Sequence, residues 1–278
     1  MESSMSCMEM LKYSLSKITF EFIGTMFLTM FFTSGSNTII LAGLFLMTCF
    51  CWKISGSHFN PAVTLAMMLR RGEAKFPVSR GVFYIVAQFI GGYIGACIVN
   101  FFTLDLKILE YTDPFIMRAT VQELLASFTF VVFFLSQTDA SMLFSKEAAI
   151  NCLILASCYV GTRAIWYGQP TALCWNDANG DKQCTQIGGY ATSTFGIVAN
   201  PAIALGICLS GLFNEGFSAW TAVYLYPVVP FVGAFLAFLF FEFVYKKTYE
   251  VFHPDAANEA GRSGTGMMEN QVADREDF

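Results

Sequence analysis

Two apolar stretches that are too short to cross a membrane constrain the fold of this chain more than any other feature. They run over about residues 61–70 and 201–212, and each opens on a proline that follows an asparagine. At about 1.5 Å per residue, each covers roughly 15–18 Å, which is about half the hydrocarbon thickness of a bilayer. Asparagine is a good helix N-cap, and proline is tolerated at the first helical position. The pattern predicts two half-helices that begin at membrane depth.

Longer apolar stretches accompany the two short ones. Each of these is long enough to span a bilayer, and the six candidates are about 17–34, 38–55, 79–102, 119–138, 147–165 and 217–245. Only 13% of the residues are charged, against about 25% in a soluble domain, so lipid is the expected solvent. We predict an all-α membrane protein of six transmembrane helices and two re-entrant half-helices.

The chain reads as two similar halves, about 17–102 and 119–246. Glu21-Phe-Ile-Gly-Thr in the first half corresponds to Glu123-Leu-Leu-Ala-Ser in the second. Each half has three spans, an odd number, so the second half must sit inverted relative to the first. Inverted repeats whose broken helices meet at the midplane are typical of channels and transporters. Residues 17–246 are therefore expected to form one channel domain.

Both ends of the chain fall outside this domain. Residues 1–16 are expected to form an amphipathic helix on the membrane surface or a frayed terminus, and residues 247–278 a disordered acidic tail. The positive-inside rule favours cytoplasmic termini, in a plasma membrane or an endomembrane. The inner side then carries Lys12, Lys17, Lys53, Arg70, Arg71, Lys75, Arg80, Lys146, Lys246 and Lys247, and the outer side Lys107, Arg118, Arg163 and Lys182.

The reactive residue types give little sign of chemistry. Of the nine cysteines, only Cys174 and Cys184 lie in a polar loop. A disulfide between them is plausible if that loop faces an oxidising space. The spans contain no nucleophile–base set and no metal-type cluster, so we expect no enzyme, no cofactor and no metal. No basic face points to nucleic acid.

The two turns have a physical rationale of their own. Two half-helix N-termini that meet at the midplane each carry roughly half a positive charge. The Asn60 and Asn200 amides would cap the opposite backbone and donate hydrogen bonds to one water, which interrupts a proton wire while the positive ends repel cations. Pro61 and Pro201 leave no backbone donor unpaired. The small side chains of Ala62 and Ala202 let the turns approach closely.

The segment Ile54-Ser-Gly-Ser-His-Phe-Asn-Pro-Ala-Val-Thr64 closely resembles the first signature of the major intrinsic proteins, the aquaporin superfamily. The second Asn-Pro-Ala lies at the matching place of the second half. The resemblance covers about residues 17–246 and implies a homotetramer, embedded in the lipid bilayer, that conducts water or small neutral solutes. It implies that Glu21, Glu123 and Gln88 support the pore loops and that His58 lines the cytoplasmic vestibule.

The outer constriction departs from this family. Most members have an arginine directly after the second Asn-Pro-Ala, and here that position is Ile203. Ile197 stands three residues before Asn200, where the family has another contributor. The two remaining contributors fall at Ile40 or Ala42 and at Cys158 or Tyr159.

An apolar constriction leaves three alternatives open. A wide constriction would pass glycerol, urea, ammonia or another small neutral solute along with water. A tight isoleucine plug would conduct poorly and leave a structural role in a membrane complex. In the third alternative, Arg163 at the outer end of the fifth span restores the missing charge.

Overall fold

The computed structural model of the chain describes residues 7–71, 75–103, 115–139, 142–143, 145–167, 171–176, 182–187, 197–215 and 225–253. The helices of the first half are α1 (Cys7–Phe32), α2 (Asn37–Ser55), α3 (Pro61–Leu69) and α4 (Val78–Thr103). Those of the second half are α5 (Phe115–Gln137), α6 (Ala148–Tyr167), α7 (Pro201–Glu215) and α8 (Leu225–Phe240). A π-helical segment η3 (Phe241–Tyr245) and a short helix α9 (Lys246–Phe252) continue α8 without a break.

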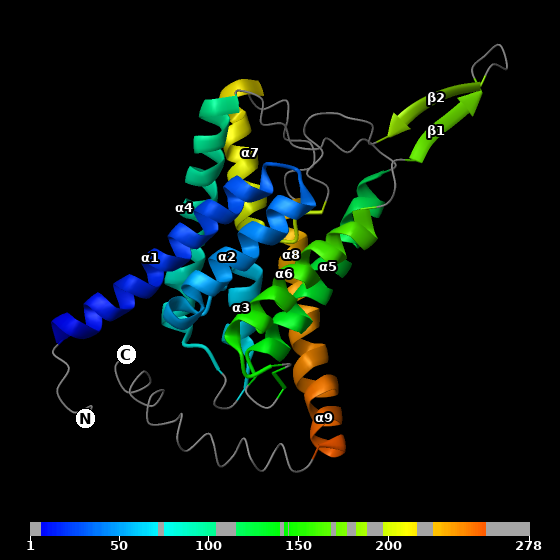
Figure 1. Cartoon of the computed structure of the whole chain (residues 1–278). Coiled ribbons are helices and arrows are strands. Elements are labelled where there is room, and N and C mark those ends of the chain that lie inside the picture. Colours follow the sequence, from blue (N-terminus) through cyan, green and yellow to red (C-terminus); the bar gives the residue numbers. More distant parts are fainter. Residues whose placement is uncertain are drawn as a thin grey trace.

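The predicted membrane fold is confirmed. The helices α1, α2, α4 and α5, and the continuous rod from α8 to α9, are each long and apolar enough to cross a bilayer. The sixth span is α6, whose apolar part is the shorter stretch Ala148–Ala164. Figure 1 shows that α1 begins and α9 ends on the same side of the bundle, which we call the terminal side.

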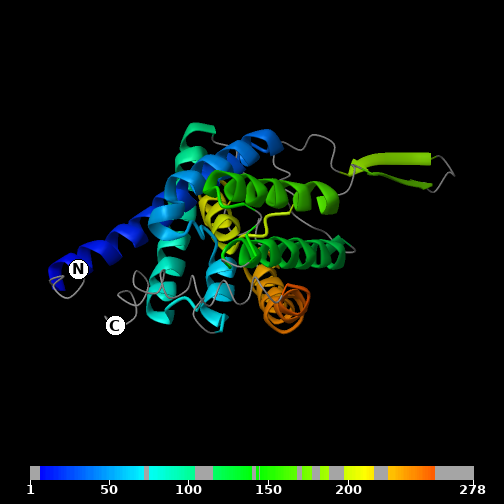
Figure 2. The same ribbon diagram turned by 60° about the horizontal axis from the view of Figure 1, so that its bottom comes forward.

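The two predicted half-helices are α3 and α7, which are shorter than the spans around them. Each starts at the proline of its Asn-Pro-Ala turn. The chain is extended at Asn60 (φ −151°), and the side-chain oxygen of Asn60 accepts from the backbone N–H of Ala62 as an N-cap. In Figures 1 and 2, α7 lies among the longer helices. It packs on α4, α8 and α1, and α3 packs on α8, α4 and α5.

Glycines permit the close approach of α4 to α7. A methyl group added at Gly92 would lie 2.3 Å from the carbonyl oxygen of Ala202, the third residue of the second turn. On the facing helix, a methyl group at Gly206 would lie 2.4 Å from the backbone of Gly92. Because neither position has room for a side chain, the start of α7 rests directly on the backbone of α4.

Three segments differ from the sequence-based expectations. Residues 7–16 do not form a separate surface helix, because they are the first turns of α1. Residues 247–252, which we expected in a disordered tail, extend the last span as α9. The polar loop after α6 contains an antiparallel hairpin, β1 (Thr171–Asn176) and β2 (Lys182–Ile187), which extends away from the helical bundle in both views (Figures 1 and 2).

Candidate functional site

The candidate site is built from the two loops that lead into α3 and α7. In each loop the residue before the asparagine has a positive φ, 48° at Phe59 and 49° at Ala199. Non-glycine residues rarely adopt this left-handed conformation, which costs on the order of 1–2 kcal/mol. Neither residue is a glycine, so surrounding contacts must hold both loops in place.

A buried carboxylate holds the first loop. One oxygen of Glu21 accepts from the backbone N–H of His58 at 3.0 Å, and the other accepts from that of Phe59 at 2.7 Å. The same carboxylate accepts from the Ser55 hydroxyl and from the Gln88 side-chain amide, both at 2.7 Å. Glu21 is fully buried, and four donors compensate for the water that its charge has lost.

A second buried carboxylate holds the second loop in the same way. The two oxygens of Glu123 accept from the backbone N–H groups of Val198 and Ala199. The Val198 carbonyl in turn accepts from the Tyr159 hydroxyl at 2.6 Å. Each glutamate therefore binds the two residues that directly precede an asparagine.

The two turns cap each other through their asparagines. The Asn60 side-chain nitrogen donates to the Ala199 carbonyl, and the Asn200 side-chain nitrogen donates to the Phe59 carbonyl, both at 2.9 Å. Each side-chain oxygen accepts from its own helix, at Ala62 and at Ala202. An amide nitrogen carries two N–H groups, and within the described residues one of the two on each asparagine has no protein acceptor.

A small cavity lies against this asparagine pair. It has room for about one water molecule. Its walls are mixed, with polar groups from the turns and apolar groups from the spans. The lining residues are Leu28, Leu44, Thr48, Ser57, His58, Asn60, Phe130, Phe134, Leu155, Tyr159 and Asn200. His58 is buried, and its Nδ1 lies 3.2 Å from the Thr64 hydroxyl.

A second layer lies one helical turn from the cavity, away from the terminal side. Phe32, Ile40 and Arg163 form this layer. Each lies four residues from a lining residue on the same helix face, from Leu28, Leu44 and Tyr159 respectively. These three side chains are all buried, and the Arg163 guanidinium lies 4.2 Å from the centre of the Phe32 ring.

The remaining filter candidates separate into buried and less buried positions. Ile197 and Ile203 are both buried. Of the two pairs that the sequence left open, Ile40 and Tyr159 are buried, whereas Ala42 is exposed and Cys158 is only partly buried.

The register of the hairpin sets Cys174 opposite Cys184. The side chains of these two cysteines lie outside the described part of the chain, so their disulfide stays a prediction.

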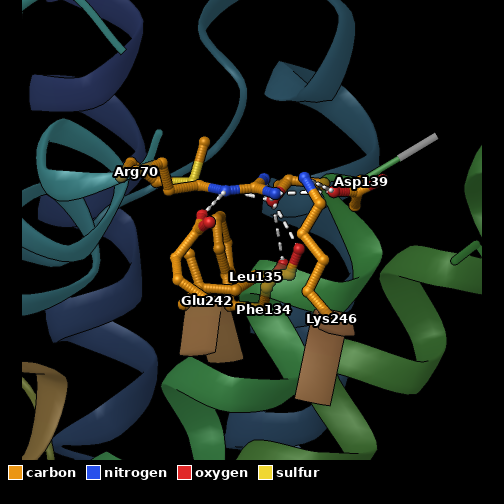
Figure 3. Close-up of polar contacts among 8 residues, drawn as sticks. Arg70, Phe134, Leu135, Asp139, Glu242 and Lys246 are labelled. Atoms are coloured by element: carbon orange, nitrogen blue, oxygen red, sulfur yellow. Dashed lines mark hydrogen bonds and ion pairs between the residues drawn. The ribbon is translucent and has the colours of Figure 1, made fainter. Parts of the chain in front are cut away.

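An ionic cluster that sequence reasoning did not predict lies at the far end of α3, toward the terminal side. Figure 3 shows the Arg70 guanidinium between Glu242 and Asp139, with Lys246 beside Asp139. Arg70 contacts Asp139 at 2.7 Å and Glu242 at 3.3 Å, and Lys246 lies 3.5 Å from Asp139. Position alone makes Arg70 look like an ordinary charge at the end of an apolar run. Its partners are 69 and 172 residues away, and no local motif links them.

Comparison with known proteins gives a consistent result. The family model described as major intrinsic protein matches residues 36–166. An aquaporin of Laccaria bicolor is 30% identical over 162 residues, which are 52% of this chain and 57% of that protein. An aquaglycerol porin of Saccharomyces cerevisiae is 34% identical over 101 residues, 31% of this chain and 15% of that protein. The chain thus spans little more than half of the first relative and much less of the second.

A solved structure resembles the whole fold. The aquaglyceroporin from Plasmodium falciparum superposes with a TM-score of 0.62, covering 86% of this chain and 99% of that one at 17% sequence identity. At this identity the likeness concerns the fold alone.

Proposed function

Since the chain belongs to the major intrinsic protein superfamily, we propose that it is a passive transmembrane channel for water and small neutral solutes such as glycerol, urea or ammonia. The observation that carries this proposal is the asparagine pair, which caps two facing half-helices beside a cavity with room for about one water. A water there can accept from both asparagines. It is then held in one orientation, and the positive ends of α3 and α7 oppose cations.

The test is permeability in a defined membrane. Purified protein in liposomes should raise water permeability above that of empty vesicles in stopped-flow light scattering. Vesicles carrying an Asn60→Ala, Asn200→Ala double variant, matched for protein content, provide the control. If the wild-type protein gives no increase for water or for glycerol, the channel proposal fails.

A non-conducting membrane scaffold is the second candidate, and a specific contact favours it. The Tyr159 hydroxyl, which lines the cavity, donates to the Val198 carbonyl, and the side chains of Ile40, Ile197 and Ile203 are all buried. Tyr159→Phe removes this bond without adding volume. A channel that is merely narrowed by the bond should conduct faster in this variant, whereas a scaffold should stay closed.

We further propose that the outer layer selects against cations through Arg163. The family position for arginine is occupied by Ile203, and Arg163 lies inside the bundle against Phe32. A cation about 4–5 Å from a fixed charge meets a barrier of about 3–4 kcal/mol at an effective dielectric constant of 20. Arg163→Met should therefore raise cation or proton leak while water permeability persists. An unchanged leak removes Arg163 from this role.

Ile203 provides a second probe of the same layer. Ile203→Arg should lower glycerol permeability relative to water, because it adds bulk and a second cation to an apolar constriction. Ile203→Met is the control for size without charge. Equal glycerol-to-water ratios in both variants and the wild type would place Ile203 away from the constriction.

The assembly and orientation proposed here follow the family resemblance and the distribution of lysine and arginine. We propose a homotetramer with the terminal side of each protomer facing the cytoplasm. Native mass spectrometry of the detergent-solubilised protein should give four copies. An epitope tag after Phe278 should be reached by antibody only in permeabilised cells, and labelling of intact cells would reverse the orientation.

A further inference from the structure

We propose that Arg70 is a positioning residue for the pore, acting as a latch that fixes the terminal-side end of the half-helix α3. The latch consists of Arg70, Asp139 and Glu242 (Figure 3). The proposal rests on the channel function above, because its effect on permeability needs a conducting pore, but the anchoring of α3 can be measured without conduction.

The burial of Arg70 first sets the latch apart from an ordinary boundary charge. Its side chain has no exposed surface, and the side chains of Glu242 and Asp139 are only 6% and 11% exposed. The guanidinium donates from Nε to Glu242, from Nη2 to Asp139, and from Nη1 to the Thr138 hydroxyl. The planar guanidinium presents its donors in a rigid fork that meets all three acceptors, whereas the three donors of a lysine radiate from a single nitrogen.

The π-helical segment η3 brings the last span into the latch. In η3 the backbone N–H of Lys246 bonds to the carbonyl of Phe241, five residues earlier. Both Phe241 and Glu242 are buried there, and the Arg70 guanidinium lies 5.1 Å from the centre of the Phe241 ring while it contacts Glu242. Short π-helical insertions in α-helices are frequent at functional sites. Here the insertion coincides with two consecutive residues that both meet Arg70.

The latch connects three elements of the fold. Arg70 directly follows α3, Asp139 follows α5, and Glu242 belongs to the rod that continues α8. The half-helix α3 is short, so it moves as one rigid element. Its other end carries Asn60, which is tied to the second turn. A latched α3 has both of its ends fixed.

A second route leads from the latched end to the cavity. The Met67 carbonyl near the end of α3 accepts from the backbone N–H groups of Arg70 and Phe76. The Phe76 ring packs 4.8 Å from the ring of His58, which lines the cavity. Movement at the latched end would therefore reach the cavity wall through Phe76 as well as along α3.

Removing one ionic partner and removing both should have different effects on stability. A buried charge that has lost its partner destabilises strongly, whereas an ion pair replaced by apolar side chains of similar volume is often neutral. Arg70→Met alone leaves the buried Glu242 without its ionic partner and should thus lower Tm by roughly 5–20 °C. The double variant Arg70→Met, Glu242→Met should recover most of this loss, because Asp139 still has Lys246.

Permeability separates positioning from mere stability. If the latch positions α3, the double variant regains stability but not conduction. Its water permeability per folded protein should stay below that of the wild type by up to about tenfold. This is the change in rate that corresponds to the free energy of one hydrogen bond of ordinary strength. Arg71→Met is the matched control, since this neighbouring arginine is exposed and lies over Phe243, away from the latch. Double-variant permeability that returns to wild type along with Tm overturns the proposal.

Hydrogen–deuterium exchange tests the same inference without conduction. In the double variant, peptides from residues 57–69 should exchange faster than in wild type, while peptides from α1 do not change. This measurement tests the latch even if the wild-type liposomes prove impermeable. An impermeable wild type would refute only the channel proposal. Wild-type exchange across residues 57–69 in the double variant would overturn the latch.

Discussion

The four hydrogen bonds at Glu21 make Glu21→Gln an informative perturbation of the pore loops. Glutamine keeps one acceptor oxygen and replaces the other with an N–H₂ donor. If the retained oxygen serves Ser55 and His58, the new donor faces the Phe59 N–H and the Gln88 amide. Gln88 can turn its own oxygen toward the new donor. The Phe59 N–H cannot adapt, and it stays buried without an acceptor.

The expected cost follows from this count of donors. One buried backbone donor without a partner costs about 1–3 kcal/mol, and the remaining bonds lose about 1 kcal/mol each when their acceptor is no longer charged. Relief of the buried charge offsets part of this loss. A net destabilisation of about 2–4 kcal/mol corresponds to a Tm lowered by roughly 5–15 °C.

Thermal unfolding of the detergent-solubilised protein, followed by tryptophan fluorescence, measures the effect. Glu147→Gln is the matched control, because Glu147 is exposed and such surface changes usually stay within about 0.5 kcal/mol. The positive φ at Phe59 should relax once its N–H is released, so water permeability should fall together with Tm. An unchanged or raised Tm in Glu21→Gln would refute the reasoning, since it would mean that the carboxyl group does not accept four hydrogen bonds as a charged group.

Two further predictions concern packing and the hairpin. Gly92→Val should displace the start of α7 and lower both Tm and water permeability, because its side chain would meet the Ala202 carbonyl, whereas Gly161→Ala, with open space around it, should be silent in both assays. Directly opposed residues of an antiparallel pair have Cα atoms about 4.5–5.5 Å apart, within the disulfide range. Alkylation of the unfolded protein from an oxidising compartment should therefore modify seven of the nine cysteines before reduction and all nine after it, and nine before reduction would exclude the Cys174–Cys184 bond.

The half-helices could be predicted from the sequence because their signals are local. Asparagine, proline and an apolar run of limited length are neighbours in the chain, and the starts of α3 and α7 at Pro61 and Pro201 follow from them. The hairpin could not be predicted, because neither Thr171–Asn176 nor Lys182–Ile187 shows the alternation of apolar and polar residues that is typical of a strand. The extension of the last span through α9 could not be predicted either, because its charged residues resemble those of a disordered tail.

Two filter positions were left ambiguous by the sequence, and the spacing of residues along a helix face bears on both. Helical spacing relates Ile40 to Leu44 and Thr48, and Tyr159 to Leu155. The structure puts Leu44, Thr48 and Leu155 in the cavity wall. Ala42 falls off its face, whereas Cys158 is three residues from Leu155 and is set apart only by its partial exposure. The spacing was visible in the sequence, but the face that points inward was not, because membrane helices are apolar on all sides.

Buried charges divide into those that sequence reasoning finds and those that it misses. Glu21 and Glu123 stand inside apolar spans, where a charge is costly and attracts notice. Arg70 stands at the end of an apolar run, where the positive-inside rule expects a cation, so it was counted only as a marker of orientation. Its lack of exposed surface shows that this count includes a residue with another role. We can set aside Arg70 and its neighbour Lys246 on the inner side, and the buried Arg163 on the outer side. Of the lysines and arginines named above, eight then remain on the inner side and three on the outer side. The predicted orientation therefore does not depend on the latch, and Arg70 is better explained by the anchoring of α3 than by membrane topology.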